Sequence, residues 1–205
     1  MTRVYFVRHA QPEHDLEEDR TRPLTEEGKK DSAIVLEFLK DKKIDAFYCS
    51  PYKRSMDTIA EAADFFTKEI ITDERLRERE KGLDGNNHGM FRKRWADHNY
   101  HEEGGESIAM VQKRNIEALN EILSDNTDKD IVIGTHGTAL STILNFYDNN
   151  FGCEDFLRII DWMPYIIELD FESSCNEMES ECPSYSFKLI GKQEHCYIEK
   201  EFKGK

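Results

Sequence analysis

Runs of consecutive apolar residues, each leading to a polar side chain, recur along the chain. One run covers residues 4–7 and leads directly into Arg8 and His9; another covers residues 131–133 and is followed, two small residues later, by His136. Continuous apolar runs of this length are typical of strands that are buried on both faces of a parallel sheet. Because ligands of such sheets bind at the carboxyl ends of the strands, we expect the two histidines to face one site.

Between these runs, apolar side chains recur at helical spacing. Thr25 and Ser50 are expected to cap two helices, the second with Pro51 at its first helical position, and Ser107 is expected to begin a third. Strands are expected at residues 2–7, 44–49, 69–72, 131–134, 165–171 and 185–190. This alternation predicts an α/β fold, a three-layer α/β/α sandwich with a mostly parallel central sheet and the active site at the C-terminal edge of the strands.

The chain length of 205 residues suits one domain, so residues 1–205 are predicted to form a single unit. Within it, residues 86–105 show no clear hydrophobic period. A segment of this length without a pattern, inside a compact domain, is typical of a functional excursion such as a lid. Arg92 and Trp95 in this segment are candidate substrate contacts, and ordinary packing of the segment is the alternative interpretation.

Charge and composition narrow the choice of partner. The formal net charge of −14 repels polyanions, so neither nucleic acid nor an acidic membrane surface is expected as a partner. No apolar run approaches the roughly 18 residues of a membrane span, and no secretory signal is visible. Five cysteines without a Cys-x-x-Cys pair favour a reduced, cytoplasmic protein. A small phosphate ester remains a compatible partner, because a ligand of that size interacts mainly with the charges that line its binding cleft.

Two arginines and two histidines are expected to meet at the edge of the sheet. Arg8 and His9 end the first strand, His136 ends a later one, and Arg54 lies in the first turn of the helix expected after Ser50. A guanidinium group binds phosphate through a planar fork of donors. A neutral histidine can attack phosphorus and hold the phosphoryl group covalently. The four side chains therefore predict a pocket for a tetrahedral dianion.

A carboxylic acid that protonates the departing oxygen would complete this chemistry. Glu78, Glu80 and Asp84, in or near a charged run, are the candidates. No metal ion and no cofactor is expected, because the arginines and histidines themselves supply the positive charge of the pocket. A nucleotide-binding fold is disfavoured, because no glycine-rich loop of the G-x-G-x-x-G or G-x-x-x-x-G-K type follows a strand.

Five short motifs follow one another along roughly residues 1–145. In chain order they are Arg8-His9-Ala10, Ser50-Pro51-Tyr52-Lys53-Arg54, Leu76-Arg77-Glu78, Gly104-Gly105-Glu106-Ser107 and Thr135-His136-Gly137. Each motif is weakly specific, but their common order makes the joint signal strong. Together they resemble the histidine phosphatase superfamily, in its phosphoglycerate-mutase-like branch.

The resemblance implies a role for each residue of the site. His9 would be the nucleophile that becomes phosphohistidine. Arg8, Arg54 and His136 would bind the phosphoryl oxygens. Glu78 would donate a proton to the leaving group and then act as the base that activates water. Neither a metal ion nor a cofactor is implied.

The chain departs from the family pattern at Asp31-Ser32, with little expected effect, and at two positions that bear on the site. Ala10 stands where glycine is usual, although its carbonyl can still orient the His9 ring; Asp15 stands where asparagine is common, and its carboxylate would repel phosphate. Because the catalytic residues are shared within the family, three functions are open. These are a phosphomonoester hydrolase, a bisphosphoglycerate-dependent phosphoglycerate mutase and a non-catalytic phospho-ligand-binding module. The short region after residue 145 favours the hydrolase.

Overall fold

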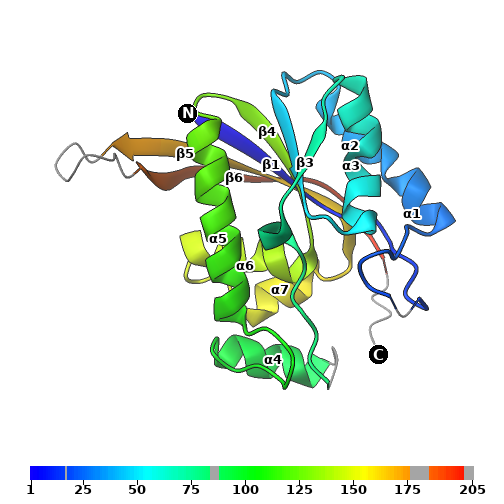
Figure 1. Ribbon diagram of the computed structural model, residues 1–205, viewed down its shortest axis with the longest axis vertical. Coiled ribbons are helices and arrows are strands. Elements are labelled where there is room, and N and C mark those ends of the chain that lie inside the picture. Colours follow the sequence, from blue (N-terminus) through cyan, green and yellow to red (C-terminus); the bar gives the residue numbers. More distant parts are fainter. Residues whose placement is uncertain (17, 84–87, 176–184, 201–205) are drawn as a thin grey trace.

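One sheet runs through the part of the chain that this computed structural model describes, residues 1–16, 18–83, 88–175 and 185–200 (Figure 1). Its strands are β1 (Thr2–Arg8), β2 (Ala46–Cys49), β3 (Ile70–Thr72), β4 (Asp130–Thr135), β5 (Trp162–Cys175) and β6 (Tyr185–Glu199). They lie in the order β3-β2-β4-β1-β5-β6. The first four strands in the chain are parallel to one another, and β5 and β6 add an antiparallel edge. The prediction of a mostly parallel central sheet is confirmed.

Helices cover both faces of this sheet, as Figure 1 shows. They are α1 (Glu26–Asp31), α2 (Ala33–Leu39), α3 (Lys53–Phe65), α4 (His88–Ala96), α5 (Ile108–Asp125), α6 (Gly137–Tyr147) and α7 (Cys153–Ile159), with a 3₁₀ turn, η1, at Glu74–Leu76. As predicted, Thr25 caps α1 and Ser107 caps α5, each by accepting a hydrogen bond from a backbone N–H three residues later. None of the helices in the described ranges is long and apolar enough to cross a membrane.

The two faces of β1 belong to two separate hydrophobic cores. Val4 and Phe6 pack with side chains of α5, α6 and α7, whereas Tyr5 and Val7 pack with side chains of α2 and α3. Successive strand side chains point to opposite faces, so a strand in the middle of a sandwich is apolar at every position. This burial explains why the first apolar run of the sequence is continuous.

The structure corrects one predicted cap. The helix expected at Ser50 with Pro51 in its first turn instead begins at Lys53, with Tyr52 as the N-cap residue. The Ser50 hydroxyl accepts a hydrogen bond from the backbone N–H of Tyr52 (3.2 Å) and closes a turn before the helix. Arg54 remains in the first turn, as expected.

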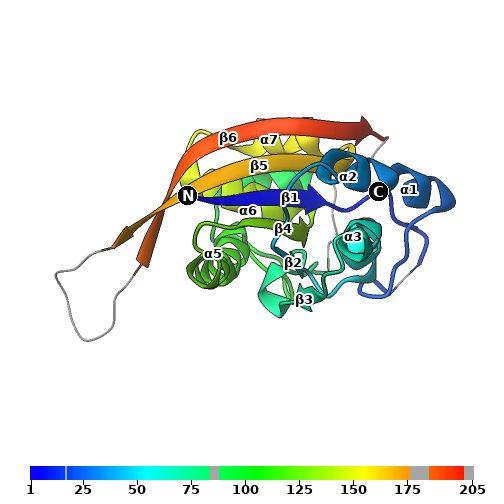
Figure 2. The same ribbon diagram turned by 90° about the horizontal axis from the view of Figure 1, so that it is seen from above.

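The two late strands are longer than predicted. The expected strand at residues 165–171 coincides with the part of β5 that pairs with β1, where Tyr165 opposes Arg8 and Phe171 opposes Thr2. Beyond that part, β5 pairs only with β6, and the two strands extend past the rest of the sheet (Figure 2). In β5, the hydrophobic pattern marked the stretch that pairs with β1. Most of the loop expected between them, residues 176–183, lies outside the described residues.

The segment predicted as a lid contains a packed helix. Residues 86 and 87 are not described, but α4 follows at once, and its Phe91 and Trp95 belong to the larger hydrophobic core. The Phe91 ring contacts Phe156 of α7 edge to face, with 5.2 Å between the ring centroids. Two apolar residues four apart are too few to mark a helix in a charged sequence, which is why no period was visible.

Candidate active site

The carboxyl ends of β1, β2 and β4 meet at one edge of the sheet. Arg8 opposes Thr135 in the ladder, and the backbone N–H of His9 donates to the Thr135 carbonyl (3.1 Å). The ring centroids of His9 and His136 consequently lie 5.2 Å apart, with the rings edge to face. Ser50 follows β2 at the same edge and contacts His136. Parallel pairing has thus placed the two strand-end histidines side by side, as their positions in the sequence predicted.

His9 is held in one orientation by its own backbone neighbour. Its Nδ1 lies 2.7 Å from the Ala10 carbonyl, which can only accept, so Nδ1 carries the proton and the lone pair is on Nε2. The Ala10 N–H in turn donates to Thr58 Oγ1 (2.9 Å) and fixes that peptide. Burial, together with the charges of Arg54 and Arg8, holds the pKa of His9 well below its usual range. Its Nε2 is therefore unprotonated and carries a lone pair.

Arg8 is anchored at the C-terminal end of α7. Its two terminal nitrogens donate to the carbonyls of Ile159 (2.5 Å) and Ile160 (2.8 Å), where the helix dipole favours a cation. Its Nε is buried and has no hydrogen-bond partner among the described residues. Burial lowers the pKa of Arg8 to about 10, so the side chain stays charged at neutral pH. Gly137 leaves room for it, since a Cβ there would lie 3.3 Å from the guanidinium carbon.

Arg54 reaches the same edge from the first turn of α3. Its guanidinium donates to the Asp19 carbonyl (2.7 Å) and lies 3.4 Å from the Asp19 carboxylate. The carbon of its guanidinium is 4.9 Å from the ring centroid of Tyr52, which also packs edge to face on His136. Burial lowers the pKa of Arg54. The guanidinium of Arg22 lies 2.8 Å from the Asp19 carboxylate and is a second cation there. This corner of the site is a cluster of cations around a single carboxylate.

His136 is fully buried and ends the loop before α6. Its Nε2 lies 2.7 Å from Ser50 Oγ, and its Nδ1 is buried with no hydrogen-bond partner in the described part of the chain. Burial, then the charges of Arg54 and His9, hold the pKa of His136 well below its usual range. His136 is therefore a neutral side chain among cations.

Glu78 meets the site at the N-terminus of α6. Its carboxylate accepts hydrogen bonds from the backbone N–H groups of Thr138 (3.1 Å), Ala139 (3.2 Å) and Arg79 (2.7 Å). The positive end of a helix dipole favours such an anion. Because α6 begins directly after His136, the Glu78 carboxylate is bonded to backbone groups only two and three positions beyond that histidine. Of the alternatives, Glu80 is exposed and Asp84 is outside the described ranges.

Two residues of α5 and its approach hold the backbone around Glu78. Arg114 donates to the carbonyls of Arg77 (2.7 Å) and Glu78 (3.1 Å). Glu106 accepts from Arg114 (2.8 Å) and from the backbone N–H of Glu80 (2.9 Å). We call this pair the Glu106–Arg114 clamp. Sequence reasoning missed it, because Glu106 stood only in a helix-start motif and Arg114 contacts residues up to 39 positions away.

The predicted substrate contacts of α4 lie elsewhere. Arg92 is exposed and forms an ion pair with Glu154 of α7. Trp95 is buried against Phe151 and Phe156, with 6.2 and 5.8 Å between ring centroids. Among the contacts described for these two side chains, none is with the five residues at the sheet edge, Arg8, His9, Arg54, Glu78 and His136. Their role in substrate binding stays a prediction.

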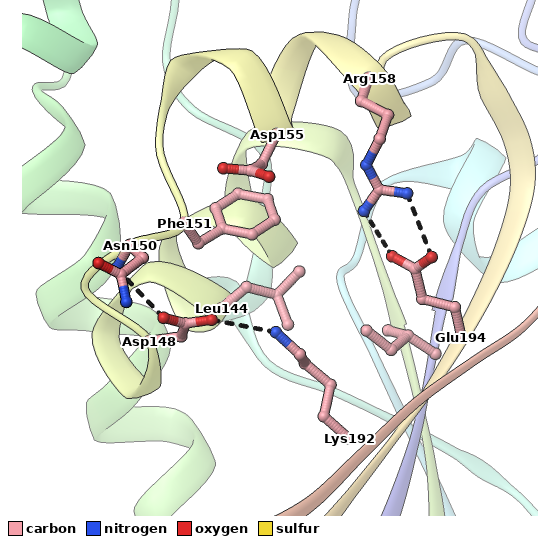
Figure 3. Close-up of a pocket in the computed structure, with 9 residues that line it drawn as sticks. Leu144, Asp148, Asn150, Phe151, Asp155, Arg158, Lys192 and Glu194 are labelled. Carbon is pink, nitrogen blue, oxygen red and sulfur yellow. Dashed lines mark hydrogen bonds and ion pairs between the residues drawn. The ribbon is translucent and has the colours of Figure 1, made fainter.

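A separate pocket of about 140 Å³ opens between α6, α7 and β6 (Figure 3). Four of its charged side chains form two ion pairs: Arg158 binds Glu194 (2.6 Å) and Lys192 binds Asp148 (3.2 Å). None of the five residues at the sheet edge lines it. The pocket is therefore distinct from the candidate active site.

Comparison with known proteins supports a single family. Phosphoserine phosphatase 1 of Hydrogenobacter thermophilus is 29% identical over 158 residues, which cover 66% of this chain and 71% of that protein. The 2,3-bisphosphoglycerate-dependent phosphoglycerate mutase of Thermoplasma acidophilum is 44% identical over 55 residues, 27% of this chain and 28% of that protein. The native structure of a mycobacterial glucosyl-3-phosphoglycerate phosphatase shares the fold, with a TM-score of 0.69, 17% identity and coverage of 91% of this chain and 97% of that one.

A sequence model of one family spans most of the chain. The model, described as histidine phosphatase superfamily (branch 1), matches residues 4–160, which include Arg8, His9, Arg54, Glu78 and His136. The match agrees with the resemblance seen in the motifs. On this match, and on a fold that its structural relatives share, the chain belongs to branch 1 of the histidine phosphatase superfamily.

Proposed function

We propose that this protein is a metal-independent phosphomonoester hydrolase that acts through a phosphohistidine at His9 on a small phosphorylated metabolite. The observation that carries the proposal is the buried His9, whose Nδ1 is bonded to the Ala10 carbonyl, so that Nε2 is unprotonated in a ring that experiences the charges of Arg54 and Arg8. A nucleophile of this kind must be unprotonated at neutral pH while the dianion it attacks must be held by positive charge. Burial beside two arginines meets both conditions.

Three side chains bind the phosphoryl group in this mechanism. Arg8 offers its Nε and Arg54 its guanidinium fork, while His136 offers the ring nitrogen that has no partner among the described residues. Charge-assisted hydrogen bonds of this kind are about twice as strong as neutral ones. The Asp19 carboxylate, which now lies beside Arg54, gives way to the phosphoryl group.

Transfer and hydrolysis follow as two steps at phosphorus. The Nε2 of His9 bonds to phosphorus as the bond to the ester oxygen breaks, and Glu78, which enters this step in its protonated form, gives its proton to that oxygen. Water then attacks the phosphohistidine, Glu78 takes a proton from it, and the bond between phosphorus and nitrogen breaks. His9 is restored and inorganic phosphate leaves.

The relatives suggest which substrates to test first. One is a phosphoserine phosphatase and another is a glucosyl-3-phosphoglycerate phosphatase, so both names describe small phosphate monoesters that carry a carboxylate. We extend this class to the present chain as a proposal, with phosphoserine and 3-phosphoglycerate as the first candidates. We also propose the cytoplasm as its location, which agrees with free thiols at Cys49, Cys153 and Cys196.

Trapping of the intermediate tests the nucleophile. Protein mixed with a ³²P-labelled phosphomonoester and quenched should carry label that is stable in base and lost in acid, as a phosphoramidate is. The His9→Ala variant should carry none, while His101→Ala, which removes an exposed histidine, should label normally. Label that persists on His9→Ala protein would refute the assignment.

The mutase remains the second candidate, because a relative with that activity matches part of the chain. Release of inorganic phosphate is compared with interconversion of 3- and 2-phosphoglycerate, with bisphosphoglycerate present as primer. We expect phosphate release to dominate. Interconversion many times faster than phosphate release would establish the mutase instead.

A further inference from the structure

The hydroxyl of Ser50 has an unusual set of neighbours. Ser50 is fully buried at the end of β2, and its Oγ lies 2.7 Å from Nε2 of His136. The same oxygen accepts a hydrogen bond from the backbone N–H of Tyr52 at 3.2 Å. The other ring nitrogen of His136, Nδ1, is buried and finds no hydrogen-bond partner among the described residues.

Counting donors and acceptors decides the direction of the serine–histidine bond. A serine hydroxyl has one proton to donate and two lone pairs, one of which Tyr52 already occupies. Within the described ranges, Nε2 of His136 is the one acceptor that the Ser50 hydroxyl meets. If the hydroxyl donates to Nε2, its proton is bonded and the ring proton is on Nδ1. In the opposite tautomer two buried groups, the hydroxyl proton and the Nδ1 lone pair, would lack partners among the described residues, whereas the Nδ1–H tautomer leaves only the ring N–H unpaired.

The surroundings of His136 keep the ring neutral. The fully buried ring lies near the cations Arg54 and Arg8, which disfavour a third positive charge. A phosphoryl dianion presents only acceptors, so a neutral ring binds it well only when its N–H group is directed at the phosphoryl oxygens. With the proton on Nδ1, that nitrogen can donate a hydrogen bond to a phosphoryl oxygen. With the proton on Nε2, the lone pair of Nδ1 would repel the phosphoryl oxygens.

We propose that Ser50 is a positioning residue for His136: by donating to Nε2, it holds His136 as the neutral Nδ1–H tautomer, which donates a hydrogen bond to the phosphoryl group. The phosphoryl group as ligand rests on the proposed function. The tautomer itself does not, because it follows from contacts in the protein alone. Ser50 thereby links β2 to the chemistry at the end of β4, although it does not touch the reacting atoms.

Nitrogen NMR of the wild-type protein tests the tautomer directly. The ring nitrogens are labelled with ¹⁵N, and the signals of His136 are identified by their loss in His136→Asn protein. At neutral pH and without ligand, we expect a protonated Nδ1 and an unprotonated Nε2. A proton on Nε2, or on both nitrogens, would overturn the proposal. This readout involves no turnover, so it stands apart from the test of the phosphohistidine.

Matched serine variants test the effect on binding. Ser50→Ala should lose the preference for Nδ1–H and raise the inhibition constant of inorganic phosphate by roughly 2- to 10-fold, the range of one net hydrogen bond. Ser50→Thr keeps the hydroxyl and should restore both readouts. Ser141→Ala, which removes a buried hydroxyl without a partner among the described residues, is the control and should change neither.

The fold of each variant is compared with wild type by circular dichroism before binding is measured. A folded Ser50→Ala protein with the wild-type tautomer would show that Ser50 only fills space. Loss of the tautomer preference with unchanged phosphate binding would refute the link from Ser50 to the phosphoryl group. If phosphohistidine formation failed while the wild-type tautomer was as expected, the proposed function would fall and the tautomer assignment would stand.

Discussion

His9 and His136 are neutral because they are buried beside cations, and this has a consequence for stability. Burial and then Arg54 hold the pKa of each well below its usual value. In the unfolded chain both histidines have a pKa of about 6.5. As the pH falls through that value, the unfolded state therefore binds protons that the folded state does not. We expect the free energy of unfolding to be undiminished above pH about 6.5 and to fall below it, by up to about 1.4 kcal/mol per pH unit for each histidine.

Urea unfolding at a series of pH values measures this slope. His136→Asn protein should lose part of it, because one of the two buried neutral rings is gone. A slope that steepens in the variant, or stability that rises as the pH falls below about 6.5, would contradict the burial of neutral histidines.

Glu78 allows a second prediction at the scale of one residue. Glu78→Gln should slow the hydrolysis of alkyl phosphates by about 10²–10⁴-fold and that of nitrophenyl phosphate much less, because a general acid matters most when the departing oxygen is basic. Steady-state rates on a series of esters measure the difference. Equal losses across the series, or the same pattern in Glu80→Gln protein, would move the role away from Glu78.

At the scale of elements, the site depends on three helices, two of them through their termini. The C-terminal carbonyls of α7 hold Arg8, and the N-terminus of α6 holds the Glu78 carboxylate. The third, α5, contributes Arg114 to the Glu106–Arg114 clamp, which holds the backbone of the Glu78 segment. Helix termini leave unpaired backbone groups, and here those groups are satisfied by the charged side chains of the site.

The clamp predicts a catalytic effect at a distance. Arg114→Ala should lower turnover of alkyl phosphates by between about 10- and 100-fold, because a small displacement of Glu78 spoils proton transfer. Nitrophenyl phosphate should be less affected, as for Glu78 itself. The matched control is Lys113→Ala, on the exposed side of the same helix. Equal losses on both esters would indicate general unfolding instead of a displaced acid, and wild-type rates would show that the clamp is dispensable.

At the scale of the whole molecule, the positive charge of the site is assembled from separate parts of the chain. Arg8 ends β1, Arg54 begins α3, and the N-terminus of α6 adds a partial charge, all within a protein of net charge −14. In the proposed mechanism these groups supply the positive charge that a metal ion supplies at metal-dependent phosphatase sites. We therefore expect full activity after dialysis against excess chelator, measured as phosphate release. Loss of activity that a divalent cation restores would contradict this expectation.

The hydrophobic pattern by itself determined the buried part of the fold. The runs at residues 4–7 and 131–133 mark β1 and β4, and residues 165–171 mark the part of β5 that pairs with β1. A strand covered on both faces must be apolar at each position, so its pattern is visible locally. The strand-end side chains Arg8, His9 and His136 could be expected together for the same reason, since parallel strands bring their carboxyl ends to one edge.

Only the tertiary structure decided how those side chains are held. Ser50, expected as a helix cap, instead contacts His136, which is 86 residues away, and the carbonyls that anchor Arg8 come from Ile159 and Ile160, more than 150 residues away. A polar side chain carries no local sign of its distant partner, because serine and arginine suit a helix end, a surface or a site equally well. The sequence therefore determined which groups reach the edge of the sheet. The packing of β2, α5, α6 and α7 decided how those side chains are oriented and which of them are charged.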